Sequence, residues 1–167
     1  KTYRIVTRVL AIITSYFVGL FEVFYQANHY FDFNGLLAVS VHYHLLFTAV
    51  FCFLLFRNRT AKNDKIMNAI AILNIVVFTL IFSRIPFSEL QDNIIDGTNQ
   101  NIAYYLHMLS ILFIVFFWYL IYNSNKKEKV FAAFNHKLAI WVPAFLLVVL
   151  TSTELVLQGL HMMNLSI

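Results

Sequence analysis

The chain has 167 residues, of which 60% are hydrophobic and only 12% are charged. A soluble globular domain is about half apolar and about a quarter charged, so this composition excludes a soluble domain and predicts a protein embedded in lipid. The net charge of +4 does not indicate a nucleic-acid partner, because the charges gather in short clusters between long apolar runs.

Five apolar runs are long enough to cross a bilayer as helices. In lipid every backbone donor and acceptor needs an internal partner, and these runs lack the alternating pattern of barrel strands, so helices are expected. The prediction is an all-α fold, a polytopic transmembrane helical bundle in one domain, 1–167. In chain order, the five expected helices cover residues 5–26, 36–56, 66–82, 102–122 and 138–160.

Basic residues are confined almost entirely to alternate connections between these helices. The positive-inside rule then predicts a cytoplasmic N-terminus, two cytoplasmic basic loops and a C-terminus on the outside. Outside these regions the chain has one further basic residue, Arg84. The clustered residues are Lys1, Arg4 and Arg8, then Arg57, Arg59, Lys62 and Lys65, and finally Lys126, Lys127, Lys129 and Lys137.

The longest predicted outer connection, residues 83–101, contains two local signals. Pro86 suits the first turn of a helix, and the pair Asp96 and Gly97 is typical of a turn. The connection is therefore expected to form either a short helix lying on the outer surface or a plain loop.

The first and fifth expected helices end in the same pattern, Glu-x-x-x-Gln-x-x-His. Residues at i, i+4 and i+7 share one face of a helix, so each pattern forms a polar stripe. The match favours a parallel repeat of four helices, with the fifth helix opening a second copy, and chance is the alternative. The residues are Glu22, Gln26 and His29 in the first helix and Glu154, Gln158 and His161 in the fifth.

The glutamate and histidine residues within the expected helices all lie in the outer half of the membrane. Such residues are costly in lipid, so their common depth favours a polar binding site that opens to the outside. Interhelical hydrogen bonding and extension toward the interface are the alternative reading. The candidate binding residues are Glu22, His44, His107 and Glu154, with Gln26, His29, Gln158 and His161 as secondary members.

Other polar residues in the helices are interpreted as structural. His42 is two residues from His44 and points nearly the opposite way, so it is expected to pack rather than to join the site. Asn74 is expected to bond a neighbouring helix, and Cys52 to act as a small buried residue. The chain has no HExxH pattern, and no metal, cofactor or catalytic residue is predicted.

Two segments, Leu20–Gln26 and Ser152–Leu155, resemble bacterial membrane proteins grouped as domain of unknown function 2339. Those proteins are long, have many transmembrane helices and have no assigned activity. The resemblance implies that the chain is a fragment of a larger helical array, which agrees with its start at Lys1 rather than at Met. It implies no catalytic residue.

Together these observations predict a non-enzymatic transport, binding or scaffold module in a bacterial inner (plasma) membrane. Its expected partners are the lipid bilayer and further transmembrane helices of the same or a partner chain, and nucleic acid is not expected. The alternative is an intramembrane enzyme, either metal-dependent or acting on a lipid-linked envelope substrate.

Overall fold

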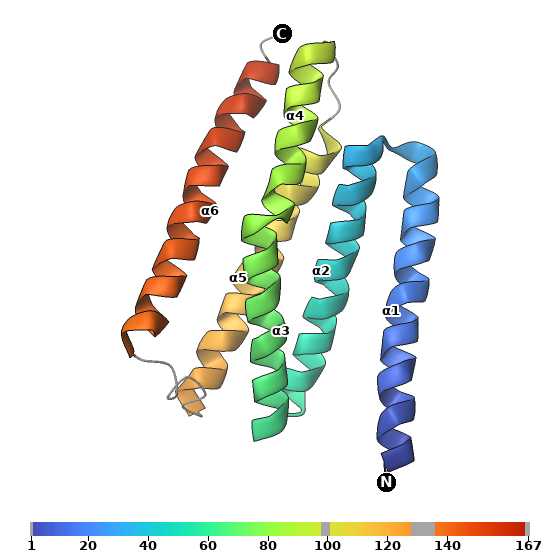
Figure 1. Ribbon diagram of the computed structural model, residues 1–167, viewed down its shortest axis with the longest axis vertical. Coiled ribbons are helices and arrows are strands. Elements are labelled where there is room, and N and C mark those ends of the chain that lie inside the picture. Colours follow the sequence, from blue (N-terminus) through green and yellow to red (C-terminus); the bar gives the residue numbers. More distant parts are fainter. Residues whose placement is uncertain (1, 98–100, 128–135, 166–167) are drawn as a thin grey trace.

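The computed structural model describes residues 2–97, 101–127 and 136–165, and all regular structure within these ranges is helical. The predicted all-α fold is confirmed, and each predicted span lies within a helix or a run of helices (Figure 1). In chain order these are α1 (Thr2–Tyr30), α2 (Phe33–Arg57), α3 (Ala61–Leu80), the 3-10 helix η1 (Phe82–Arg84), α4 (Ile85–Asp96), α5 (Ile102–Lys127) and α6 (His136–Asn164).

Five segments of the described residues are long and apolar enough to cross a membrane, which identifies an integral, multi-pass membrane protein. The third segment joins α3, η1 and α4 into one span, so it is much longer than the predicted helix over residues 66–82. The segments are Val6–Tyr30, Phe33–Arg57, Ala61–Asp96, Ile102–Ser124 and Ala144–Met163.

The five spans alternate in direction, with α3 and α4 running the same way within the third span (Figure 1). The end of the bundle at which α1 begins also holds the end of α2, the start of α3, the end of α5 and the start of α6. Arg57 at the end of α2, Arg59 in the connection and Lys62 in the first turn of α3 therefore lie at the end where α1 begins. The helices α2, α3 and α5 form the centre, α1 packs on α2 at one edge, and α6 packs mainly on α4 at the other.

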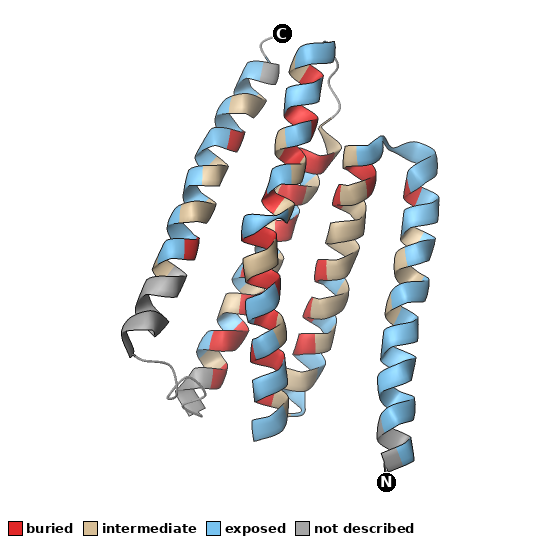
Figure 2. Ribbon diagram, viewed as in Figure 1, coloured by how far each residue is buried: buried red, intermediate tan, exposed pale blue. Residues whose placement is uncertain are grey.

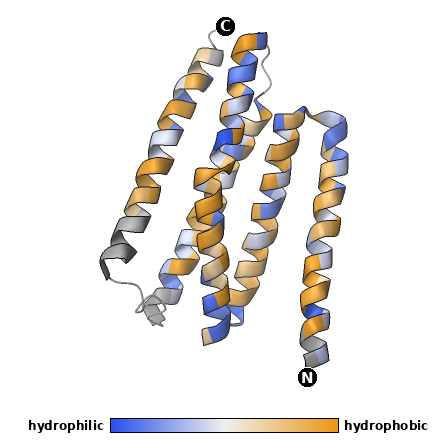
Figure 3. Cartoon of the chain, in the orientation of Figure 1, coloured by the Kyte–Doolittle hydropathy of each residue, from blue (hydrophilic) through white to orange (hydrophobic). Residues whose placement is uncertain are grey.

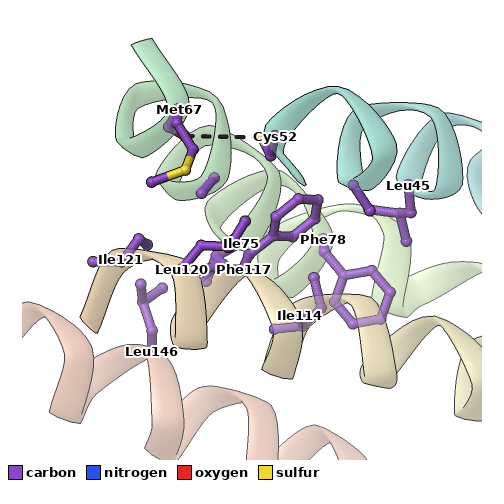
Figure 4. Packing of buried hydrophobic residues seen from close by; sticks show 12 residues of the cluster. Leu45, Cys52, Met67, Ile75, Phe78, Ile114, Phe117, Leu120, Ile121 and Leu146 are labelled. Atoms are coloured by element: carbon purple, nitrogen blue, oxygen red, sulfur yellow. Dashed lines mark hydrogen bonds between the residues drawn. The ribbon is translucent and has the colours of Figure 1, made fainter. Parts of the chain in front are cut away.

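One apolar core joins the middle of α2, α3 and α5 and includes Leu146 of α6 (Figure 4). The small side chains of Ala49, Cys52 and Ala71 allow α2 and α3 to approach closely, as is common in membrane bundles. Cys52 is free and fully buried, as predicted for a small apolar residue. Buried residues concentrate on α2 to α5, whereas α1 is exposed along nearly its whole length (Figure 2).

Asp32 closes the short connection between α1 and α2. Its Oδ1 accepts a hydrogen bond from the Gly35 amide at 2.8 Å, which caps α2 and starts it at Phe33 rather than at the predicted residue 36. Gly35 also lies where α2 approaches α5, because a Cβ at this position would lie 2.7 Å from Ile102 Cγ2.

The predicted outer connection, 83–101, contains a helix packed within the bundle. Pro86 stands in the first turn of α4, and Gly97 ends the helix in the left-handed region with a φ of 64°. The plain-loop alternative is therefore wrong, and the helix runs along the bundle rather than across its end (Figure 1). It carries several hydrophilic residues (Figure 3), yet it contacts α2, α5 and α6. Its buried residues are Pro86, Glu89, Leu90 and Asn93.

Glu89 accounts for the docking of α4. Its two carboxylate oxygens accept hydrogen bonds from the backbone amides of Ala103 at 2.7 Å and Tyr104 at 2.9 Å, in the first turn of α5. The first amides of a helix lack partners within it and carry partial positive charge, so a carboxylate is well placed there. A charge that seemed to belong to an outer loop therefore caps a neighbouring helix and is only 1% exposed.

A second set of polar contacts joins helices at the opposite end of the bundle. Arg59 pairs with Asp64 at 3.1 Å and donates to the Asn123 carbonyl oxygen at 3.4 Å, so it joins the α2–α3 connection to α5. The side chain of Thr60 caps α3 by accepting from the Asn63 amide at 3.1 Å.

We expect Glu89→Gln to lower the free energy of unfolding by about 1–3 kcal/mol, because a buried charge-assisted cap is replaced by an amide whose NH2 group faces backbone donors. Asp96→Asn, the same chemical change at an exposed position of α4, should change it by less than about 0.5 kcal/mol. Reversible denaturation in detergent, followed by circular dichroism, measures both. Equal effects of the two substitutions would contradict the capping role.

Candidate functional site

Two of the four candidate binding residues meet between α5 and α6. The His107 Nε2 atom lies 2.6 Å from Glu154 Oε1, with side chains that are 3% and 20% exposed. The imidazole also stacks on Phe78 of α3, with ring centroids 5.1 Å apart and nearly parallel planes. Hydrogen bonds that involve an ionised partner are short and comparatively strong, so this contact ties α6 to the bundle at a defined level.

The polar contacts continue along α5 and α6 toward the end of the bundle where α6 ends. Tyr104 donates its hydroxyl hydrogen to Gln158 Oε1 at 2.8 Å, and its ring stacks on His161 with centroids 3.9 Å apart. Tyr104 and His107 are three residues apart on α5, so they face α6 together. We call Tyr104, His107, Glu154, Gln158 and His161 the α5–α6 ladder.

The matching stripe on α1 has a different environment. Glu22 and Gln26 are exposed, and Gln26 Nε2 donates to Glu22 Oε1 at 2.9 Å within the same helix. His29 is exposed as well and contacts the ring of the neighbouring Tyr30. Among the residues that the structure describes, no side chain of another helix bonds to Glu22, Gln26 or His29.

His44 lies on a separate side of the bundle and bonds to α1. Its Nδ1 atom shares a 2.9 Å hydrogen bond with the Tyr16 hydroxyl. His42, on the opposite face of α2, shares a 3.2 Å hydrogen bond with Ser110 of α5 and packs on Phe113. The expectation that His42 and His44 point to different neighbours is thereby confirmed.

His44 borders a groove of about 660 Å³ between α1, α2 and the α3–η1 segment. Most of the groove wall is aliphatic or aromatic, and no Lys, Arg, Asp or Glu lines it. The polar lining residues are Tyr16, Ser40, His44, Thr48 and Asn74.

A short polar network spans the groove wall. Asn74 donates to the Ile70 carbonyl oxygen at 2.9 Å and accepts from the Thr48 hydroxyl at 3.3 Å, so it bonds a neighbouring helix as predicted. Tyr43 of α2 also bonds to α1, because its hydroxyl donates to the Tyr16 carbonyl oxygen at 3.2 Å. Its hydroxyl occupies the space that a Cβ on Gly19 would need, so glycine permits this contact.

The four candidate residues therefore do not form one pocket. His107 and Glu154 meet, His44 faces the groove, and Glu22 is exposed on α1. The sequence predicted that the four residues lie at one depth in the membrane. The side chain of His44, however, faces α1 rather than α5.

Two residues that the sequence reasoning missed take part in these sites. Tyr104 shares a face with His107, so the three-residue spacing could have identified it. Tyr16 had no comparable signal in the sequence. Within residues 2–97, 101–127 and 136–165, no three His, Cys, Asp or Glu side chains gather in a way that could hold a metal ion.

Comparison of the chain with protein-family models, curated proteins and solved structures found no match in any of the three. The resemblance to domain of unknown function 2339 therefore stays a prediction.

We expect His107 and Glu154 to be coupled energetically. In a double-mutant cycle of His107→Gln and Glu154→Gln, the coupling energy should be about 1 kcal/mol, as for other interhelical hydrogen bonds in membranes. Unfolding in mixed detergent micelles gives the four free energies. The control cycle pairs His107→Gln with Glu22→Gln and should be additive, because these side chains do not touch. Additivity in both cycles would refute the coupling.

Proposed function

We propose that this chain is a membrane-embedded binding module that holds a neutral amphipathic lipid in the groove between α1, α2 and the α3–η1 segment. The observation that carries the proposal is the groove itself. Its volume of about 660 Å³ lies within the range of about 300–1,000 Å³ typical of ligand sites.

The lining favours a ligand with an apolar body. Ligand sites are mostly apolar and use a few polar groups to fix orientation, and this wall has the same composition. Each of the three helices that form the groove supplies polar side chains. These are Tyr16 on α1, His44 and Thr48 on α2, and Asn74 on α3. Such groups suit a hydroxyl or a carbonyl on the ligand.

The described residues that line the groove include no charged side chain, and this supports a neutral ligand. A charged head group would lose its hydration without gaining an ion pair, which is costly in an apolar environment. A lipid alcohol or ester carries hydrogen-bonding groups without this cost, and we therefore assign the ligand to that class.

For the cellular setting, we propose a bacterial inner membrane with the N-terminus in the cytoplasm. The support is the gathering of Arg57, Arg59, Lys62 and Lys65 at the end of the bundle where α1 begins. In this orientation the α5–α6 ladder and Glu22 belong to the outer half of the membrane.

A photoactivatable diacylglycerol tests the binding site. In liposomes it should label peptides from α1 and α2, and Ser40→Phe should lower the labelling about tenfold by placing a ring in the groove. Ser152→Phe is the matched control, because Ser152 is exposed on α6 and lies outside the groove. Mass spectrometry of the labelled peptides measures the outcome. Labelling that Ser40→Phe leaves unchanged, or labelling of α6 equal to that of α1 and α2, would contradict the proposal.

Removing one polar group from the groove should have a smaller effect. Thr48→Val should weaken the labelling about fivefold, the equivalent of about 1 kcal/mol from one hydrogen bond. Thr151→Val is the control, since Thr151 makes the same kind of bonds to its own helix but is exposed on α6. Chemical conversion of the probe by the wild-type chain would instead support the intramembrane enzyme.

A further inference from the structure

The polar stripe of Glu22, Gln26 and His29 on α1 has no contact with another helix among the described residues, although each member of the same stripe on α6 contacts α5. We propose that this stripe is a docking surface for a partner transmembrane helix that presents a tyrosine and a histidine three residues apart. The chemistry of this partner is that of α5.

The first support is the way the second stripe is used. On α6, the carboxylate at the first position bonds to His107, and the amide at the second position accepts from the Tyr104 hydroxyl. The imidazole at the third position, His161, stacks on the same tyrosine. A stripe of this pattern therefore recognises a Tyr-x-x-His face on an adjacent helix.

The second support is the exposure of the α1 stripe. Glu22 lies eight residues before the end of α1, roughly 12 Å at 1.5 Å per residue, and it accepts a hydrogen bond from Gln26 of the same helix. A carboxylate that faces hydrocarbon at this depth is costly, whereas one that accepts a bond from an imidazole is satisfied. Charge complementarity therefore favours a partner with a proton donor at the level of Glu22.

The third support is the geometry of α1. Among the described helices, α1 makes extensive contact with α2 only. Ala27 is its one buried apolar residue among those described. Neither Glu22 nor Gln26 lines the groove, so a helix can dock here without entering it. Both α1 and α6 run in the same direction (Figure 1), and the partner should therefore run antiparallel to α1, as α5 does to α6.

The test uses a synthetic helix as the probe. The full chain is labelled in liposomes with an acceptor on a cysteine introduced at Tyr3, which is exposed, while native Cys52 is buried. A peptide of the sequence Ile102–Ser124 carries the donor. Energy transfer should report association, and Glu22→Gln should weaken it about fivefold, as expected for one interhelical hydrogen bond of about 1 kcal/mol.

Two controls separate docking on α1 from other events. A peptide with Tyr104→Phe and His107→Leu loses the partners of both Gln26 and Glu22, so it should associate with the wild-type chain more weakly than the native peptide does with the Glu22→Gln chain. Glu154→Gln should leave association unchanged, because it alters only α6. Association that is indifferent to Glu22, or that depends on Glu154, would overturn the proposal. Glu22-dependent energy transfer between two copies of the chain, without peptide, would also overturn it and identify a second copy as the occupant.

Discussion

The structure depends on one constraint, which is that a polar side chain within a membrane-spanning helix has to find its partner inside the protein. Apolar contacts alone choose weakly between the faces of a helix, because lipid is as apolar as leucine. The bonds of Tyr16 to His44, His42 to Ser110 and His107 to Glu154 each join two helices and so define how those helices are rotated. They lie around the apolar core and fix which faces meet.

The same constraint shapes the third span. It would be long for a single straight crossing, and its second part, α4, is held in the bundle by the Glu89 carboxylate at the start of α5. In this position one side chain serves two helices, since it satisfies backbone amides of α5 and fixes α4 beside it. The polar ladder between α5 and α6 begins next to this cap, because Tyr104 both donates its backbone amide to Glu89 and its hydroxyl to Gln158.

Hydropathy predicted most of the fold, because the number and extent of apolar runs depend on the bilayer and not on the neighbours of a helix. The candidate site was predicted less well, since depth is one coordinate and the direction of a side chain around its helix is another. His107 and Glu154 shared both and meet, whereas His44 shared only depth. The packing of residues 85–96 could not be read from the sequence either, because a buried cap such as Glu89 looks like an ordinary surface charge.

The attachment of α1 to a single neighbour has a consequence for how any occupant of the groove would exchange. In the proposed membrane setting, the groove between α1 and the α3–η1 segment would open toward the acyl chains, and its occupant would arrive by lateral diffusion without crossing water. Occupancy would then follow the mole fraction of that molecule in the membrane and not its aqueous concentration. A protein of this kind would sense the composition of the bilayer in which it resides.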